Sequence, residues 1–196
     1  SSGGGDKQFG KWIFEPVDGP EGDLIRLFYS DMKRYALLLQ IHFLHVRFQF
    51  HLRAALSPTT VGLDRSLFGD VCFARINHRR GNISDLEMDV YDRARNTMLN
   101  FMPYPDVVIY LDISPEEAYE RIARRARPGE AVPLDYLAEL RDEYETMLTS
   151  LGRHTHIHRV AWTDFPDEMI PARAANAWAS AKRQIRGDWT SRNGWG

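Results

Sequence analysis

The chain has 196 residues, a length that suits a single globular domain with one hydrophobic core. Its 25 basic and 27 acidic side chains give a net charge of -2, which argues against non-specific binding to nucleic acid. The single cysteine excludes an intrachain disulfide, and every apolar run is too short to span a bilayer. The start of the chain has no signal-peptide pattern, so we expect a soluble, cytoplasmic protein with neither a membrane nor a nucleic-acid partner.

The first third of the chain predicts an arm, a strand and a long helix. Residues 1–10 are rich in Gly and Ser and are typical of a flexible arm. Residues 11–17 are typical of a short strand that ends at a proline, and residues 18–22 are typical of a turn. Apolar side chains at helical spacing predict a helix from about Asp31 to Leu56, where Ser57-Pro58 ends it.

The rest of the sequence alternates strands with helices. Strands are predicted at Thr60–Leu63, 106–112 and 156–162. Helices are predicted at about 68–77, 84–101, from Ser114-Pro115 onward, at 134–151 and at 167–185. The run at 106–112 is continuously apolar, which is typical of a parallel strand buried on both faces. We therefore predict an α/β fold with a parallel sheet, as one domain over 11–186 followed by a polar tail at 187–196.

Polar side chains follow two of the predicted strands. Glu15 could accept a proton from a substrate hydroxyl, or it could be an ordinary acid at a strand end. Arg65, in Asp64-Arg65-Ser66, could hold a phosphate or form a buried salt bridge. Ligands bind beyond the carboxyl ends of parallel strands, so these residues and Asp112 are expected on one rim.

A cluster of arginines lies at the end of the helix that starts near Ser114. Its members are Arg121, Arg124, Arg125 and Arg127. The helix dipole explains one or two cations at this end, but four before a Pro-Gly turn favour a phosphate clamp.

The alternating histidines from His154 to His158 are more typical of a half-exposed strand than of a metal centre, and we predict no metal site in the protein's own side chains.

Six short motifs follow one another in order along the chain. They are Glu15-Pro16-Val17; Phe28-Tyr29 with Arg34-Tyr35-Ala36 and Gln40; Asp64-Arg65-Ser66 with Phe68 and Asp70; Tyr110-Leu111-Asp112; the arginine cluster; and Val132-Pro133-Leu134-Asp135-Tyr136-Leu137. From about Trp12 to Leu151 the sequence resembles the deoxyribonucleoside kinases, the group of deoxycytidine, deoxyguanosine and deoxyadenosine kinases, and most of all the bacterial and phage members.

The resemblance implies a fold and an activity. The fold would be a three-layer, P-loop kinase-like arrangement, with a parallel sheet flanked by helices. The activity would be transfer of the γ-phosphate of ATP, or of another nucleoside triphosphate, with Mg²⁺, to the 5′-hydroxyl of a purine deoxynucleoside or deoxycytidine in nucleotide salvage. Members of the family are commonly homodimers, and the helix from Asp31 to Leu56 is apolar enough to contribute to such an interface.

The resemblance also implies roles for individual residues. The catalytic pair would be Glu15 as the base and Arg65 near the 5′-hydroxyl. The substrate-binding residues would be Tyr29 and Glu130 at the sugar 3′-hydroxyl, Gln40 at the base edge, Arg47 and Asp70 as the pair of members that accept purines or deoxycytidine, and Phe43 and Phe68 on either side of the base. The lid over the phosphates would be formed by Arg121, Arg125 and Arg127.

The phosphate-binding loop of that family is not recognisable in this sequence. Residues 5–11 fit most of G-x-x-x-x-G-K, but Trp12 stands where Ser or Thr would bind magnesium. A predicted strand, not a helix, follows, so we interpret this match as accidental. In the family the strand before the loop is central in the sheet, and its loss would expose two strand edges.

Three explanations remain open for the missing strand, loop and first helix. The chain could be incomplete at its N-terminus, which the loss of a whole structural unit favours. It could be a natural variant that binds triphosphate differently, or one that a partner chain completes. It could also be an inactive relative that binds nucleosides or serves as a structural subunit. A nucleoside monophosphate kinase would share the fold class, but the Tyr29 and Glu130 pair argues against it.

Overall fold

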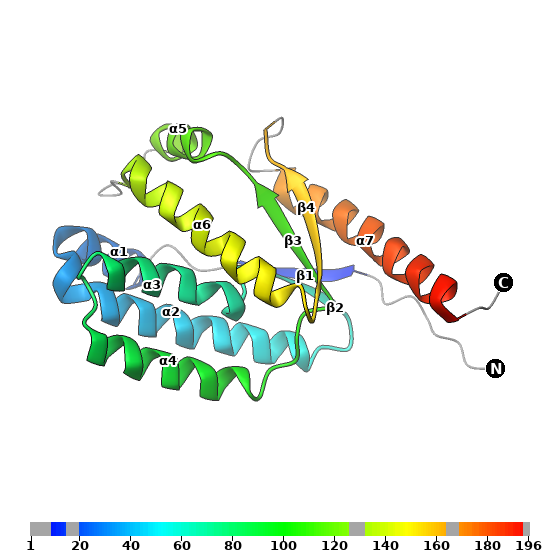
Figure 1. The fold of residues 1–196 in the computed structure, drawn as a ribbon, viewed down its shortest axis with the longest axis horizontal. Coiled ribbons are helices and arrows are strands. Elements are labelled where there is room, and N and C mark those ends of the chain that lie inside the picture. The colour runs from blue at the N-terminus through cyan, green and yellow to red at the C-terminus, as the bar shows by residue number, and fades with distance from the viewer. Residues whose placement is uncertain (1–8, 15–19, 126–131, 164–168, 194–196) are drawn as a thin grey trace.

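The computed structural model describes residues 9–14, 20–125, 132–163 and 169–193, and these form parallel strands flanked by helices (Figure 1). In chain order, the elements are β1 (Phe9–Phe14), α1 (Pro20–Ser30), α2 (Met32–Ala55), β2 (Thr60–Asp64), the 3-10 turn η1 (Leu67–Gly69), α3 (Asp70–Arg79), α4 (Asp85–Leu99), β3 (Val107–Asp112), α5 (Pro115–Arg125), α6 (Leu134–Leu151), β4 (His156–Ala161) and α7 (Ile170–Asn193). The α/β class with parallel strands is therefore confirmed.

The described strands form two separate parallel pairs. Strand β1 pairs with β2, with Ile13 opposite Leu63, and β3 pairs with β4 along its whole length. Strands β2 and β3 are not hydrogen-bonded neighbours, and together with helical side chains they line a cavity of about 470 Å³. The described strands are thus split between β2 and β3, which leaves two unpaired strand edges, as expected of such a sheet without its central strand. Because β3 borders this cavity, its residues are only half-buried and not enclosed on both faces as the sequence predicted.

The main hydrophobic core lies on one side of the strands, among α1 to α4. It is formed by buried side chains such as Phe28, Leu39, Leu44, Val71 and Tyr91. Helix α7 packs against β3 and β4 from the opposite side, which gives the three layers seen in Figure 1. Within the described ranges, no helix combines the length and the apolar character that crossing a bilayer requires.

Helix α1 is the element that the sequence analysis missed. Pro20 and Gly22 suggested a turn, but proline is favoured in the first turn of a helix, where its missing N–H costs nothing. Helices α2 and α6 have the predicted bounds to within a residue, and Ser84 and Glu87 form the predicted capping box of α4. Helix α7 runs to Asn193, beyond the boundary of the tail expected at residue 187.

A buried ion pair and a hydrogen bond to it join helices α2, α3 and α4. Arg47 of α2 is 3% exposed and Asp70 of α3 is 0% exposed, and their charged groups are in direct contact. The same carboxylate accepts a hydrogen bond from the buried hydroxyl of Tyr91 on α4. Burial raises the pKa of Tyr91, so its hydroxyl stays protonated and remains a donor. The guanidinium and the hydroxyl together compensate the desolvation of the carboxylate.

We expect Asp70→Asn to destabilise the protein by about 3–5 kcal/mol, because it leaves the guanidinium of Arg47 buried without a counter-charge. Tyr91→Phe should cost less, about 1–3 kcal/mol, since it removes one hydrogen bond to the carboxylate. The matched control is Asp89→Asn on the exposed face of α4, which should change stability by less than about 1 kcal/mol. Urea unfolding measures all three, and an Asp70→Asn cost no larger than that of the control would contradict the coupling.

His51 gives the fold a dependence on pH. Its side chain, buried near the end of α2, donates from Nε2 to the carbonyl oxygen of Pro103 at 3.2 Å. Burial lowers the pKa of His51, and the bond to Pro103 opposes this shift only in part. The folded protein therefore keeps His51 neutral under conditions in which the unfolded chain already takes up a proton at its ordinary pKa of about 6.5. Because the unfolded state binds this proton first, the contribution of neutral His51 to the stability of the fold is complete above that pH and is lost as the pH falls below it.

We expect His51→Gln to flatten the pH dependence of unfolding below about pH 6.5. The difference in slope from the parent protein should be at most about 1.4 kcal/mol per pH unit, the value for one proton. Gln49→Ala, an exposed position on the same helix without a titrating group, should keep the parent slope. Urea titrations at half-unit pH intervals measure these slopes, and identical slopes in the two variants would refute the assignment to His51.

Candidate functional site

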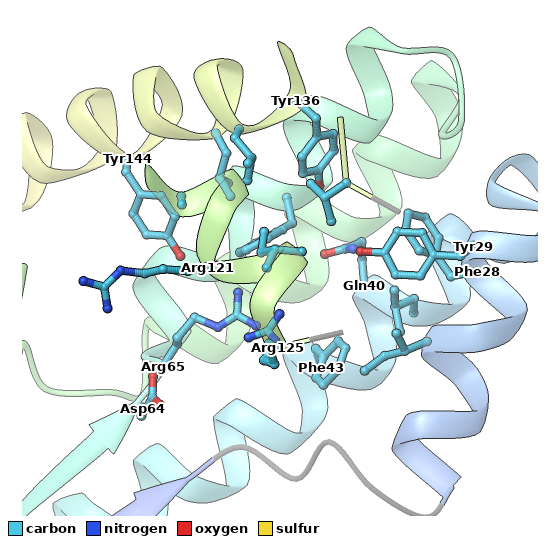
Figure 2. A pocket seen from close by; sticks show the side chains of 18 of the residues that line it. Phe28, Tyr29, Gln40, Phe43, Asp64, Arg65, Arg121, Arg125, Tyr136 and Tyr144 are labelled. Carbon is cyan, nitrogen blue, oxygen red and sulfur yellow. The ribbon is translucent and has the colours of Figure 1, made fainter. Parts of the chain in front are cut away.

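A cavity of about 770 Å³ lies between α1, α2, α5 and α6, at the carboxyl ends of β1 and β2. This volume is typical of a pocket for a small molecule. Figure 2 shows most of the side chains that line it. The two ends differ in chemistry, because one is formed by apolar side chains and an amide, and the other by arginines.

The first end of the cavity is formed by α1 and α2. Phe28 and Phe43 are both buried, and the amide of the buried Gln40 extends into the cavity (Figure 2). The guanidinium of Arg47 lies 5.0 Å from the ring centroid of Phe43, in a cation–π contact. Tyr29 adds a phenol at the same end. Flat apolar surfaces beside an amide and a fixed cation can bind a planar heterocycle and hydrogen-bond its edge.

The second end of the cavity is cationic. Arg65 follows β2, and its guanidinium lies 4.6 Å from the ring centroid of Phe73. Arg121 of α5 donates to the carbonyl oxygen of Trp162 at 3.0 Å and stacks on that indole at 4.4 Å. Arg125 lies one turn further along α5 and also lines the cavity. Guanidinium groups in this arrangement can neutralise a phosphate-bearing ligand.

Helix α6 contributes Tyr136, which the sequence analysis named in a motif without a role, and Tyr144, which it did not name. Tyr136 and Tyr144 line the cavity together with Leu140, because positions i, i+4 and i+8 share one face of a helix. Burial raises the pKa of both phenols, which therefore stay protonated. The positive charge of Arg65 opposes the shift in the pKa of Tyr144 only in part. The helical spacing in the sequence is the signal that could have identified this face.

The structure brings most of the described candidate residues to this one cavity. Those that line it are Tyr29, Gln40, Phe43, Arg47, Arg65, Arg121 and Arg125. Asp70 lies behind Arg47 and acts on the cavity only through that ion pair. Glu15, Arg127 and Glu130 lie outside the described residues.

Phe68 and Asp112 are the two remaining predicted positions. Phe68 is not among the described residues that line the cavity. It is buried in η1 with its ring stacked on Tyr104 at 5.3 Å and beside His51 at 5.6 Å, because the turn directs the side chain toward the end of α2. Asp112 is held by Arg141 at 3.1 Å and lies 3.6 Å from Arg159, so its described contacts are ion pairs.

The loop-like stretch at residues 5–11 ends in a strand. Residues 9–14 form β1, in which Lys11 is paired with Val61 of β2 and Gly10 lies at an irregularity in the pairing. A phosphate-binding loop of the G-x-x-x-x-G-K type leads instead into a helix, whose N-terminal N–H groups face the phosphates. The strand expected here is confirmed.

Comparisons with known proteins agree on one family. The family model described as "Deoxynucleoside kinase" matches residues 7–171. The deoxyadenosine kinase of Dictyostelium discoideum is 35% identical over 141 residues, which cover 71% of this chain and 58% of that protein. A deoxyguanosine kinase of Lactobacillus acidophilus is 35% identical over 70% of this chain and 60% of its own length. The chain thus spans about three fifths of the length of these curated relatives.

Solved structures resemble the fold. Deoxyadenosine kinase from M. mycoides with bound dCTP has a TM-score of 0.71 at 24% identity, over 86% of this chain and 85% of that one. The same enzyme solved with the products dCMP and a flexible dCDP has a TM-score of 0.67 at 24% identity, over 94% of this chain and 86% of that one. With the family model covering residues 7–171, the conclusion is plain: this chain belongs to the deoxynucleoside kinase family.

Proposed function

We propose that this protein transfers the γ-phosphate of ATP, or of another nucleoside triphosphate, to the 5′-hydroxyl of a purine deoxynucleoside or deoxycytidine. The observation that carries the proposal is the two-ended cavity, with Gln40 and Arg47 at one end and Arg65 and Arg121 at the other. A deoxynucleoside has the same polarity, with a planar base at one end and the hydroxyl that receives a phosphoryl group at the other.

We also propose a cytoplasmic homodimer, for which the exposed Leu38 and Leu52 of α2 supply apolar surface.

The base would be read by Gln40 and Arg47. Adenine and cytosine each place an exocyclic amine beside a ring-nitrogen acceptor, and the carbonyl and amino groups of one glutamine amide can match that pair. Arg47 offers donors only, so it suits the acceptor and not the N3–H of thymine. Asp70 would keep the guanidinium in place, and the ring of Phe43 would lie against the base.

The sugar and its hydroxyls would lie between the two ends of the cavity. Tyr29 would bind the 3′-hydroxyl together with Glu130. Glu15, one residue after β1, would accept the proton of the 5′-hydroxyl, and Arg65 would stabilise the charge that develops there. Holding the acceptor hydroxyl in line with the phosphoryl group accounts for much of the catalysis expected of such an enzyme.

The phosphates would be bound by Arg65, Arg121 and Arg125, with Arg127 completing the lid. ATP with Mg²⁺ supplies the transferable phosphoryl group. Magnesium in kinases is held by the phosphates and by one or two carboxylates, and Asp64 lies exposed at the end of β2 beside Arg65. Among the described residues no three potential metal ligands form a cluster.

A second candidate is an inactive member of the fold that binds nucleosides or serves as a structural subunit. The observation in its favour is that Gly10 and Lys11 lie in β1 and so cannot form the loop that binds triphosphate in many kinases. The relatives named above are kinases and do not support this alternative. Calorimetry with ATP and Mg²⁺ on the 196-residue chain separates the two, since magnesium-dependent binding is expected only of a kinase.

We expect the protein to form the monophosphate of at least one of deoxyadenosine, deoxyguanosine or deoxycytidine when supplied with ATP and Mg²⁺. Glu15→Gln should abolish turnover, because the amide cannot accept the proton, and should leave nucleoside affinity within about twofold. Chromatographic detection of the monophosphates and calorimetry with the nucleosides measure the two effects. If none of the deoxynucleosides is phosphorylated, the proposed activity is wrong.

We expect Gln40→Ala to weaken binding of the preferred deoxynucleoside by about tenfold or more, since it removes hydrogen bonds to the base edge. The control is Gln49→Ala, an exposed glutamine on the same helix, which should bind like the parent. Calorimetry gives both affinities. Equal affinities in the two variants would show that Gln40 does not read the base.

A further inference from the structure

Arg121 is tied to the end of the strand pair β3 and β4. Its guanidinium donates to the carbonyl oxygen of Trp162 at 3.0 Å and stacks on the indole of the same residue, 4.4 Å from the ring centroid. Glu117, one turn earlier on α5, accepts a hydrogen bond from the same nitrogen at 3.3 Å. The side chain of Arg121 is only 13% exposed, so salt and water screen its charge less than that of a surface arginine.

The strands also fix the position of Trp162. Its backbone N–H donates to the carbonyl oxygen of Asp112 at 2.8 Å, which continues the pairing of β3 with β4 one residue past Ala161. The start of α5 is held at the same edge, because the hydroxyl of Ser114, two residues after β3, accepts a hydrogen bond at 3.1 Å from the N–H of Glu117. The helix that carries the arginine and the strand end that carries the indole therefore begin from one rigid strand pair.

The contacts with Trp162 define the orientation of the guanidinium. A guanidinium is planar, so stacking on the indole fixes its plane, and the bond from its edge to the carbonyl oxygen fixes its rotation within that plane. Arg121 and Trp162 both line the cavity, and the arginine side chain extends away from Gln40 and Tyr29 at the other end (Figure 2). A cation held in this way is already ordered before a ligand arrives, which lowers the entropic cost of binding.

We propose that Trp162 is a positioning residue that holds the guanidinium of Arg121 ready to bind a phosphate of the ligand. Arg121 is then a fixed anion-binding group, and not a lid residue that must move before it meets the phosphate. This inference rests on the proposed function of the cavity and adds to it a residue that acts through Arg121. The effect is specific to the phosphate, because the base end of the cavity is formed by α1 and α2, and both residues belong to other elements.

The test is calorimetry on the full chain with deoxycytidine and dCMP, and with deoxyadenosine and dAMP. Trp162→Leu removes the indole and keeps the backbone carbonyl group. We expect the affinity for the monophosphates to fall about tenfold, because the arginine side chain must then be ordered on binding, while the affinity for the nucleosides stays within about twofold. Trp162→Phe keeps a smaller ring that attracts a cation less strongly than an indole, and its loss for the monophosphates should be about threefold.

The matched control is Trp178→Leu on α7, which also removes an indole beside a cation, since the ammonium group of Lys182 lies 4.8 Å from its ring centroid. Trp178 is not among the described residues that line this cavity, so the substitution should change the affinity for neither class of ligand. If Trp162→Leu does not fold, Trp162→Phe takes its place, and its threefold loss must again be confined to the monophosphates.

A double-mutant cycle separates positioning from direct contact between Trp162 and the ligand. In an Arg121→Gln background, the substitution of Trp162 should cause no further loss of monophosphate affinity, since the group that the indole orients is gone. An equal loss for nucleosides and monophosphates, no loss for either, or a loss that persists without Arg121 would overturn the inference while leaving the proposed function intact. Failure of the parent protein to bind any of the four ligands would overturn both.

Discussion

The buried pair of Arg47 and Asp70 is the constraint on which the arrangement of the helices depends. Taking two charges out of water is costly, and the cost is offset only when the geometry is good and the remaining hydrogen-bonding capacity is satisfied. Tyr91 supplies that second partner from α4. A shift of α2, α3 or α4 relative to the other two would break part of this set, so the pair fixes their register. It also fixes the cavity wall, because the same guanidinium packs on Phe43.

The cavity has two ends because two different kinds of element form it. Helices α1 and α2 bring apolar rings and an amide from the hydrophobic core, and this end has the character of the core that it adjoins. Arg65 comes from the carboxyl end of a parallel strand, and Arg121 comes from α5, the helix that follows β3. The general rule that ligands bind beyond the carboxyl ends of parallel strands therefore locates the cationic end, and the packing of α1 and α2 locates the other.

The sequence predicted the elements better than their packing. The bounds of α2 and α6 and the capping box of α4 follow from periodicity and capping, which are local properties. Helix α1 was missed because Pro20 and Gly22 favour a turn in most contexts. Here the proline occupies the first turn of a helix, and the packing of Phe28 stabilises that helix.

Contacts between elements were harder to predict. Most of the described site residues that the family resemblance implied line the cavity, but Phe68 does not. The direction of its side chain depends on the geometry of η1, which a sequence pattern does not reveal. The place of Tyr144 in the cavity wall depends on its contact with Phe73, which is far from it in the chain. The split between β2 and β3 is different, because the unrecognised central strand of the family had already led us to expect two exposed strand edges.

Helix α6 links the two strand pairs, and the cationic end of the cavity depends on that link. Since β2 and β3 are not paired, hydrogen bonds between strands do not set the distance from Arg65, which follows β2, to Arg121, which is bonded to Trp162 after β4. On α6, Tyr144 lines the cavity together with Arg65, and Glu145 forms a bidentate pair with Arg159 of β4 at 2.8 and 2.5 Å. One helix thus contributes to the cavity wall beside Arg65 and is also bonded to the second strand pair. The spacing of the arginines at the cationic end therefore depends on α6, and the surface of that helix is as much part of the cavity as the strand ends are.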